Sequence, residues 1–432
     1  MSDFSTVQDP AERHFRHNFF VNVMDMACFF TGYSFLSSSV ILPLFVSNLS
    51  DSKLLIGLVG MIGATGYFLP QLFTASWVEK APVKRDIVVN VGFVTERIPI
   101  FLLPLAALAA ASSPVLGLVL FFLLYASHSF GAGSVAVAWQ EMIAKIFPTN
   151  RRGGFMGLGM FIGTGAGLVG TMGSAWLLDH IAFPYGYVAC FTLAGVFIFF
   201  SWLFIRTTRE EPSKPKTITT NYWEYFLKLP GIFRDDRNFR WFIISQLILN
   251  LGGMAWVFLA IYCRNRWGLS DGMVSTYNSA LLVGQAGGNL LFGFLGDRRG
   301  YWQVMLISAV TTILALALSI FSPNPVWMYL VFALRGMSLG GLFLASLMVL
   351  EFCEEANRPT YIGINSTAMG IVGILAPLAG GWLAQTTGYL EMFWISIALT
   401  LAGALLFMTF VREPRRENSP MVLVEDESVL EN

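Results

Sequence analysis

Long apolar segments alternate with short polar ones along almost the whole chain. Twelve apolar segments reach about 20 residues, the length at which a helix crosses the hydrocarbon core of a bilayer. They are continuously apolar and lack the two-residue alternation of barrel strands, so the pattern excludes a membrane β-barrel. The sequence therefore predicts an all-α polytopic membrane protein. The predicted transmembrane helices are residues 18–46, 54–78, 87–110, 115–142, 154–178, 186–205, 240–262, 273–296, 302–321, 326–350, 362–386 and 391–411.

Composition supports this fold class. Of the 432 residues 55% are hydrophobic and only 12% are charged, whereas soluble domains carry about 25% charged residues. The formal net charge is zero, so we expect no nucleic-acid partner. The four cysteines show no Cys-x-x-Cys spacing, and we expect no metal and no cofactor.

The chain repeats itself at an offset of about half its length. Leu-Ser-Asp occurs at 49–51 and again at 269–271, and an acid directly followed by a base occurs at 79–80 and 297–298. An internal repeat of this size indicates one structural unit used twice. The longest polar interval divides the twelve helices six and six, which predicts two pseudo-symmetric halves. The expected organisation is an N-terminal segment 1–17, a first half 18–205, a linker 206–239, a second half 240–411 and an acidic tail 412–432.

The basic residues predict the orientation. With these helices, 22 of the 27 Lys and Arg residues fall on one side of the membrane and only Lys53, Arg264 and Arg266 on the other. Cytoplasmic loops retain Lys and Arg. We therefore expect both termini and the linker to be cytoplasmic, in a plasma (inner) membrane.

The stronger copy of the acid–base loop, at residues 293–300, carries a family resemblance. Twelve helices in two halves, with such a loop after the second helix of each half, resemble the major facilitator superfamily. The family motif is Gly-x-Leu-x-Asp-Arg-x-Gly-Arg-Arg. The matching positions here are Gly293, Leu295, Asp297, Arg298 and Gly300, after which Tyr301 and Trp302 replace the two bases.

The first copy departs further from the motif. Its residues are Ala75, Glu79, Lys80 and Pro82, with Lys84 and Arg85 kept. The resemblance implies that both loops act as a cytoplasmic gate that stabilises one conformation. Independently of the family, a glycine at a helix end allows a neighbouring helix to pack closely. We therefore expect close packing at Gly293.

Five ionisable side chains lie well inside the predicted helices. Each costs on the order of 2.5–3.5 kcal/mol at the membrane centre, so each needs a partner or a function. They are Asp25, Glu96, Arg97, His128 and Arg335. Asn18, Asn22 and Asp25 share one face of the first helix. A carboxyl group removed from water there could carry a proton, and a fixed salt bridge or hydrogen bond is an equally open explanation.

The resemblance implies that the first, fourth, seventh and tenth helices line a central cavity. On that basis Arg335 is expected to face an anionic substrate or Asp25. His128 is a candidate for the substrate or ion pathway, although we slightly favour a role as a hydrogen-bonded group in the core. Gln246 and Asn250 share one face of the seventh helix and suit a hydrogen-bonding substrate or helix packing. For Asn278, Gln285 and Asn289 in the eighth helix we favour packing.

Glu96 and Arg97 are adjacent and point about 100° apart on an α-helix, so they are not expected to face one partner. A structural charge pair within the first half is our first interpretation, and a proton relay toward Asp25 is the second.

The functional hypothesis is a monomeric secondary active transporter. It would move a small polar or amphipathic solute by alternating access. Without a Walker loop in the sequence the driving force is expected to be an ion gradient, with protons favoured because Asp25, Glu96 and His128 titrate. The alternative is a transport-inactive, receptor-like protein of the same fold, motivated by the weakened first motif. An enzyme is not expected, since His-Glu-x-x-His and Gly-x-Ser-x-Gly are both missing from the predicted helices.

Overall fold

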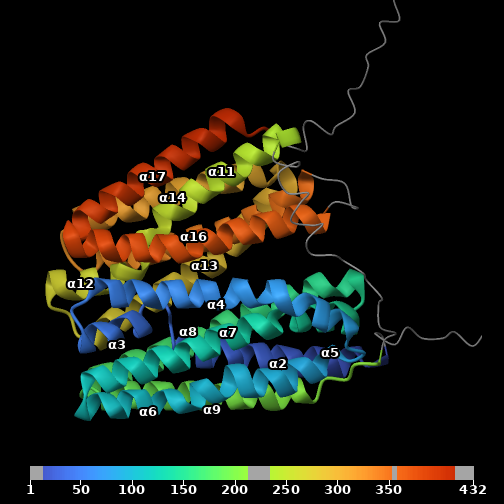
Figure 1. The fold of residues 1–432 in the computed structure, drawn as a ribbon, viewed down its shortest axis with the longest axis horizontal. Coiled ribbons are helices and arrows are strands. Elements are labelled where there is room, and N and C mark those ends of the chain that lie inside the picture. Colours follow the sequence, from blue (N-terminus) through green and yellow to red (C-terminus); the bar gives the residue numbers. More distant parts are fainter. Residues whose placement is uncertain (1–12, 213–233, 353–357, 414–432) are drawn as a thin grey trace, which may run out of the picture.

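The protein is an all-helical bundle made of two six-helix halves (Figure 1). The computed structural model describes residues 13–212, 234–352 and 358–413. The first half consists of α2 (Phe15–Ser34), α3 (Ile41–Leu49), α4 (Lys53–Lys80), α5 (Lys84–Asp86), η1 (Ile87–Val91), η2 (Phe93–Arg97), α6 (Ile98–Ser112), α7 (Pro114–Ile146), α8 (Thr149–His180) and α9 (Tyr185–Arg206). The second half consists of α11 (Arg237–Leu251), η3 (Gly252–Phe258), α12 (Leu259–Trp267), α13 (Asp271–Arg299), α14 (Tyr301–Phe321), α15 (Trp327–Ala345), η4 (Ser346–Glu351), α16 (Arg358–Thr386) and α17 (Tyr389–Phe410).

These elements form twelve membrane crossings. Within the described ranges, ten helical segments are long and apolar enough to span a bilayer. The other two crossings are α2 with α3, which a turn separates, and α15 with η4. Several helices extend a few residues beyond the apolar segments predicted from sequence. Since residues 213–233 and 414–432 lie outside the described residues, the predicted limits of the linker and the tail stay predictions.

Local sequence signals explain where several helices begin and end. The side chains of Asp236 and Ser270 accept hydrogen bonds from the backbone N–H groups of Phe239 (2.8 Å) and Met273 (3.2 Å), and so cap the first turns of α11 and α13. Gly300 separates α13 from α14 at φ 82°. That conformation strains residues with a side chain, which explains why the loop motif has a glycine there.

The duplication seen in the sequence continues in three dimensions. The Asn18 side chain accepts from the backbone N–H of Arg209 and donates to its carbonyl, both at 2.9 Å. Asn238 makes the same two bonds with Arg412, at 2.9 and 3.2 Å. Asn238 follows Asn18 by 220 positions, the offset of the Leu-Ser-Asp repeat. In each half, these asparagine clasps tie the start of the first crossing to the end of the sixth.

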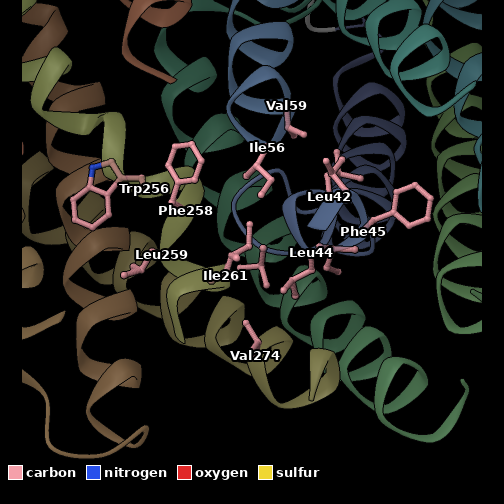
Figure 2. Packing of buried hydrophobic residues seen from close by; sticks show 14 of the residues in the cluster. Leu42, Leu44, Phe45, Ile56, Val59, Trp256, Phe258, Leu259, Ile261 and Val274 are labelled. Carbon is pink, nitrogen blue, oxygen red and sulfur yellow. The ribbon is translucent and has the colours of Figure 1, made fainter. Parts of the chain in front are cut away.

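The two ends of the bundle differ in charge and in packing. We call the end where α9 finishes and α11 starts the basic end, because it carries most of the arginines and lysines. The other end, with Lys53, Arg264 and Arg266, is the opposite end. Figure 2 shows apolar side chains of both halves meeting there, with Leu42, Phe45 and Ile56 from α3 and α4 and Phe258, Ile261 and Val274 from η3, α12 and α13. A shared core therefore joins the halves at the opposite end.

A close helix contact in the first half positions the charged part of the third crossing. Gly131 of α7 lies directly against the backbone of η2, so that a Cβ there would collide with the carbonyl of Thr95 and lie 2.7 Å from the backbone nitrogen of Glu96. Only a glycine allows this approach, and it brings α7 onto the turn that carries Glu96 and Arg97.

We therefore expect Gly131→Val to lower the free energy of unfolding by at least about 1–3 kcal/mol, because backbone atoms cannot move aside for the added side chain. Thermal unfolding of the purified protein in detergent measures this. Gly165→Val is the matched control, since a Cβ at Gly165 would meet no atom within 4 Å. Equal stability of the two variants would contradict this packing.

Candidate functional site

Asp271 is the centre of a polar cluster that joins the two halves at the opposite end. It begins α13, and its Oδ1 accepts from Nη1 of Arg264 at 3.0 Å. Its Oδ2 accepts from the amide of Asn48 at 2.5 Å and from the hydroxyl of Tyr187 at 2.7 Å. Arg264 also donates to Asn48, at 3.0 Å. Asn48 and Tyr187 belong to the first half, so this cluster, the Asp271 cluster, holds the two halves together.

Further polar contacts cross between the halves near the same end. Ser270 donates to Asp179 at 2.7 Å, and the ammonium of Lys53 donates to the carbonyl of Ala384 at 2.6 Å. Deeper in the membrane, Asn278 accepts from Ser37 (2.9 Å) and donates to Thr171 (3.1 Å). Asn278, for which the sequence favoured a packing role, thus lies between the halves.

Helix packing across the interface loosens from the opposite end toward the basic end. Gly57 of α4 lies against the carbonyl of Pro377 on α16. One turn on, a Cβ at Gly60 would lie 2.8 Å from Val257. Further along, a Cβ at Gly370 of α16 would lie 3.6 Å from Phe68, which is ordinary van der Waals contact. The halves are therefore in tight contact only over part of their length.

Gly293 shows the same difference on the other inter-half pair, α8 and α13. A Cβ at Gly272 would lie 2.6 Å from the carbonyl of Ala175 on α8. Gly293 follows 21 residues later, about 60° short of six full turns, and so lies on a neighbouring part of that face. A Cβ there would meet nothing within 4 Å. The close packing expected at Gly293 is therefore not found in this structure.

The loop motifs are placed at the basic end. The guanidinium of Arg298 lies over the Phe294 ring at 4.0 Å. Arg85 donates to Asp86 and, at 3.0 Å, to the carbonyl of Thr208. The Lys80 side chain is exposed. The side chains of Glu79 and Asp297, the two acids predicted to gate, lie outside what the structure describes.

Glu210 is a basic-end residue that the sequence reasoning missed. Its carboxylate accepts from the backbone N–H groups of Lys84 (3.0 Å) and Arg85 (2.7 Å) and from the ammonium of Lys145 (2.8 Å). It thereby caps the start of the third crossing with a negative charge, which favours a helix N-terminus. The signal was available in the repeated Arg-Glu pair at 209–210 and 412–413.

Asp25 is buried inside the first half. It is 5% exposed, and its Oδ1 accepts from the hydroxyl of Ser201 on α9 at 2.6 Å. Asn22, one turn away, donates to the hydroxyl of Thr208 (3.1 Å) and to the carbonyl of Asn18 (2.8 Å). This face of α2 therefore packs against the end of α9 and the residues that follow it.

Glu96 and Arg97 form an ion pair with each other. Nη1 of Arg97 donates to Oε2 of Glu96 at 2.7 Å, and both side chains are buried. The sequence argument assumed α-helical geometry, but η2 is a π-helical turn, in which successive side chains point less far apart. Gly92, one turn earlier, leaves room for the guanidinium, since a Cβ there would lie 2.8 Å from Nη1.

His128 links this charge pair to α2. Its Nδ1 bonds the backbone carbonyl of Glu96 at 2.9 Å, and its Nε2 lies 3.2 Å from the hydroxyl of Tyr33. A carbonyl only accepts, so Nδ1 carries a hydrogen and, in a neutral ring, Nε2 accepts from Tyr33. Tyr33 was not among the predicted residues. Asp25, Glu96, Arg97 and His128 are all buried in the first half, and together they are here called the first-half cluster.

The second half holds amide groups whose oxygens lack donors. Asn250 donates to the carbonyl of Gln246 on its own helix at 2.9 Å. Gln246 and Asn365 are buried, and in the described part of the chain nothing donates to Oε1 of Gln246 or to Oδ1 of Asn365. No three His, Cys, Asp or Glu side chains among the described residues lie close enough together to hold a metal ion.

Arg335 lies in the middle of the tenth crossing, apart from the first-half cluster. Its guanidinium stacks on the Trp256 ring of η3, 4.5 Å from the ring centroid. No carboxylate of the described residues pairs with it. The structure therefore does not join Arg335 to Asp25, which was one of the two partners predicted from sequence.

This arrangement agrees with the sequence comparison. The family model of the Major Facilitator Superfamily matches residues 24–262 and 242–426. The chain belongs to the major facilitator superfamily. Its solved members include a D-xylose-proton symporter, which has 13% sequence identity and a TM-score of 0.71 and covers 93% of this chain and 99% of its own. A likeness at that identity shows the shared transporter fold.

Two curated relatives extend the comparison. An uncharacterized MFS-type transporter of Methanocaldococcus jannaschii is 23% identical over 85% of this chain and 88% of its own length. An organic cation/carnitine transporter of Arabidopsis thaliana is 28% identical over 38% of this chain. That alignment spans only 34% of the plant protein. The chain is therefore a multi-pass membrane protein of a transporter family.

The Asp271 cluster gives a testable role for the repeated tripeptide. We expect Asp271→Asn to weaken closure of the opposite end by roughly tenfold, because charged hydrogen bonds of about 1.5–3 kcal/mol are lost. The measurement is labelling of Val257→Cys, in a cysteine-free background, by an impermeant maleimide added at the opposite end. Asp51→Asn, in the first copy of the tripeptide, is the matched control because Asp51 is exposed. Unchanged labelling in Asp271→Asn would show that the cluster does not hold the halves together.

Proposed function

We propose that this protein is a secondary active transporter that moves a small polar or amphipathic solute by alternating access, with protons as the coupling ion. The halves would rock about a site between them near the membrane midplane. The observation that carries the proposal is the unequal interface. Polar and glycine contacts seal the opposite end, while Gly293, on the same face as Gly272, has no neighbour at the basic end.

The unequal interface corresponds to one state of a two-state cycle. Opening the opposite end would break the Asp271 cluster. Closing the basic end would bring α8 onto the Gly293 face, where the glycine leaves room for a helix backbone. The motif glycine thus has a physical reason in the state that this structure does not contain.

Proton coupling is supported by the first-half cluster. Asp25, Glu96 and His128 are titratable and buried, and they lie on α2, η2 and α7, three crossings of one half. Such groups inside a membrane are costly and mark ion or proton pathways more often than not. The ion pair of Glu96 with Arg97 also fits a fixed structural role, so the proton test is directed at Asp25.

The basic end would face the cytoplasm of a plasma membrane, since its arginines and lysines follow the positive-inside rule. The working unit would be a monomer with a small solute, protons and lipid as its partners, and without nucleic acid. The xylose–proton symporter and the organic cation/carnitine transporter place sugars and small organic ions among the solutes worth testing.

A second candidate is a receptor-like protein that binds a solute without moving it across the membrane. The weakened first loop, with Ala75 and Pro82 in place of two motif glycines, favours it. In that case ligand binding would leave the opposite end closed under all conditions.

For proton coupling, we expect a pH gradient across reconstituted vesicles to change the initial rate of solute uptake, and a protonophore to abolish that change. Solutes for the assay come from a thermal-stability screen of the purified protein. The Asp25→Asn side chain cannot exchange a proton. This variant should therefore lower the initial rate of gradient-driven uptake at least about tenfold and keep solute exchange. Ser201→Ala is the control that keeps the carboxyl group. Uptake indifferent to pH and to the protonophore would refute proton coupling.

For alternating access, we expect Gly293→Leu to fold with native thermal stability, because the space around Gly293 is open here, yet to lose transport because α8 can no longer close on it. Gly165→Leu, on an exposed part of α8, is the control. The Val257→Cys labelling assay should show the opposite end permanently closed in Gly293→Leu. Full transport by this variant would contradict the proposed movement.

A further inference from the structure

Among the arginines of the described residues that stack on an aromatic ring, Arg335 is the one whose side chain is not exposed. Arg266 also stacks, on Trp267 at 4.7 Å, but its N–H groups are used. They donate to Tyr262 (2.6 Å) and to the carbonyls of Ser319 (2.9 Å), Ile320 (3.0 Å) and Ser322 (2.9 Å). Arg335 has its stacking partner, Trp256, and no acceptor among the described residues.

The position of Arg335 on α15 directs it toward the interior. Gly336 packs on the backbone of Leu281 in α13, and Ser338 bonds Thr312 of α14 at 2.5 Å, so these two sides of α15 are occupied. The exposed Leu330 lies roughly 140° from Arg335 at 100° per residue. Arg335 instead points toward η3. Because the α13 contact is made through a glycine, α15 cannot rotate to bring Arg335 elsewhere without a collision.

Trp256 places the guanidinium beside the interface between the halves. The next two residues of η3, Val257 and Phe258, lie against Gly60 and Gly57 of α4 in the first half. Arg335 is partly exposed, and about eight residues, or 12 Å at 1.5 Å per residue, separate it from the start of α15. This is the depth at which solute sites of two-fold repeated transporters lie.

A guanidinium at that depth is costly without an acceptor. It carries five N–H donors and keeps its charge at any physiological pH. Arginine matches carboxylates through paired hydrogen bonds, and stacking on an indole ring fixes the plane of the fork. Asp25, the acid considered from sequence as a partner of Arg335, lies in the other half and accepts a hydrogen bond from Ser201. Arg335 therefore lacks a negatively charged partner among the described residues.

We propose that Arg335 and Trp256 form a binding subsite for the carboxylate of a singly charged organic acid. This deepens the proposed function by naming a substrate class, and it rests on that function. One guanidinium neutralises one negative charge, and away from the ends of the membrane crossings it is the one basic group among the described residues of the second half. The apolar face of Trp256 suits the hydrocarbon part of such an acid. A cation without an acid group is excluded by repulsion from Arg335.

Matched aromatic probes test the proposal on the purified, full-length protein. Benzoate and phenylacetate carry the acid, benzamide and phenylacetamide keep the shape without the charge, and benzyltrimethylammonium carries the opposite charge. A ligand that binds the folded state raises Tm by mass action. We expect both acids to raise Tm by a few degrees at millimolar concentration, and the amides and the ammonium compound to leave it unchanged.

Variants assign the effect to the site. Arg335→Gln should abolish the acid-specific rise, and Arg335→Lys, which keeps the charge but loses the fork, should retain a reduced rise. Arg266→Gln is the matched control and should keep the full acid preference. If Arg335→Gln does not fold, Arg335→Lys and Trp256→Leu, each expected to weaken the rise several-fold, carry the test.

Three results would overturn the subsite: no acid-specific rise in the native protein, an undiminished rise in the Arg335 variants, or a preference for the ammonium compound. Reconstituted vesicles separate this proposal from the proposed function. Acid binding that depends on Arg335 without any uptake would leave the subsite standing and remove the transporter. Uptake restricted to solutes without an acid group would remove the subsite and leave the transporter standing.

Discussion

The hydrocarbon core of a membrane offers no hydrogen bonds, so a polar group within it must find its partner in the protein or in what the protein carries. This constraint organises the interior of the first half. The carboxyl of Asp25 accepts from Ser201, Glu96 pairs with Arg97, and His128 bridges a carbonyl and a hydroxyl. The guanidinium of Arg335, by contrast, contacts only the Trp256 ring among the described residues. Its position is therefore where we expect a negatively charged ligand to bind.

Glycine contacts within a half differ from those at the interface between the halves. Within a half, glycines such as Gly131 hold helices together permanently. Between the halves, Gly57 of α4 and Gly272 of α13 lie against backbone atoms of the neighbouring helix, whereas a Cβ at Gly293 of α13 would meet no atom within 4 Å. The polar contacts of Asp271 lie at the rim, where water can replace each hydrogen bond when it breaks.

The fold followed from the sequence because its signals are local and long: twelve apolar segments, a repeated tripeptide and a biased distribution of basic residues. The partners of the candidate site residues were harder to predict from the sequence. Ser201 lies 176 positions from Asp25, and no pattern along the chain names it. Glu96 and Arg97 form the structural charge pair that the sequence favoured, although α-helical periodicity would point them apart, because the turn there is a π-helix. Asp271 was read as part of a repeat, since its cluster exists only after three crossings of two halves meet.

The asparagine clasps have a consequence for how the molecule is held together. Asn18 fastens the start of the first crossing to Arg209, three residues after the sixth crossing, and Asn238 fastens the start of the seventh crossing to Arg412, two residues after the twelfth. Each half is thereby closed into a ring by its own hydrogen bonds. Each clasp joins residues of one half only, so it does not depend on contacts with the other half.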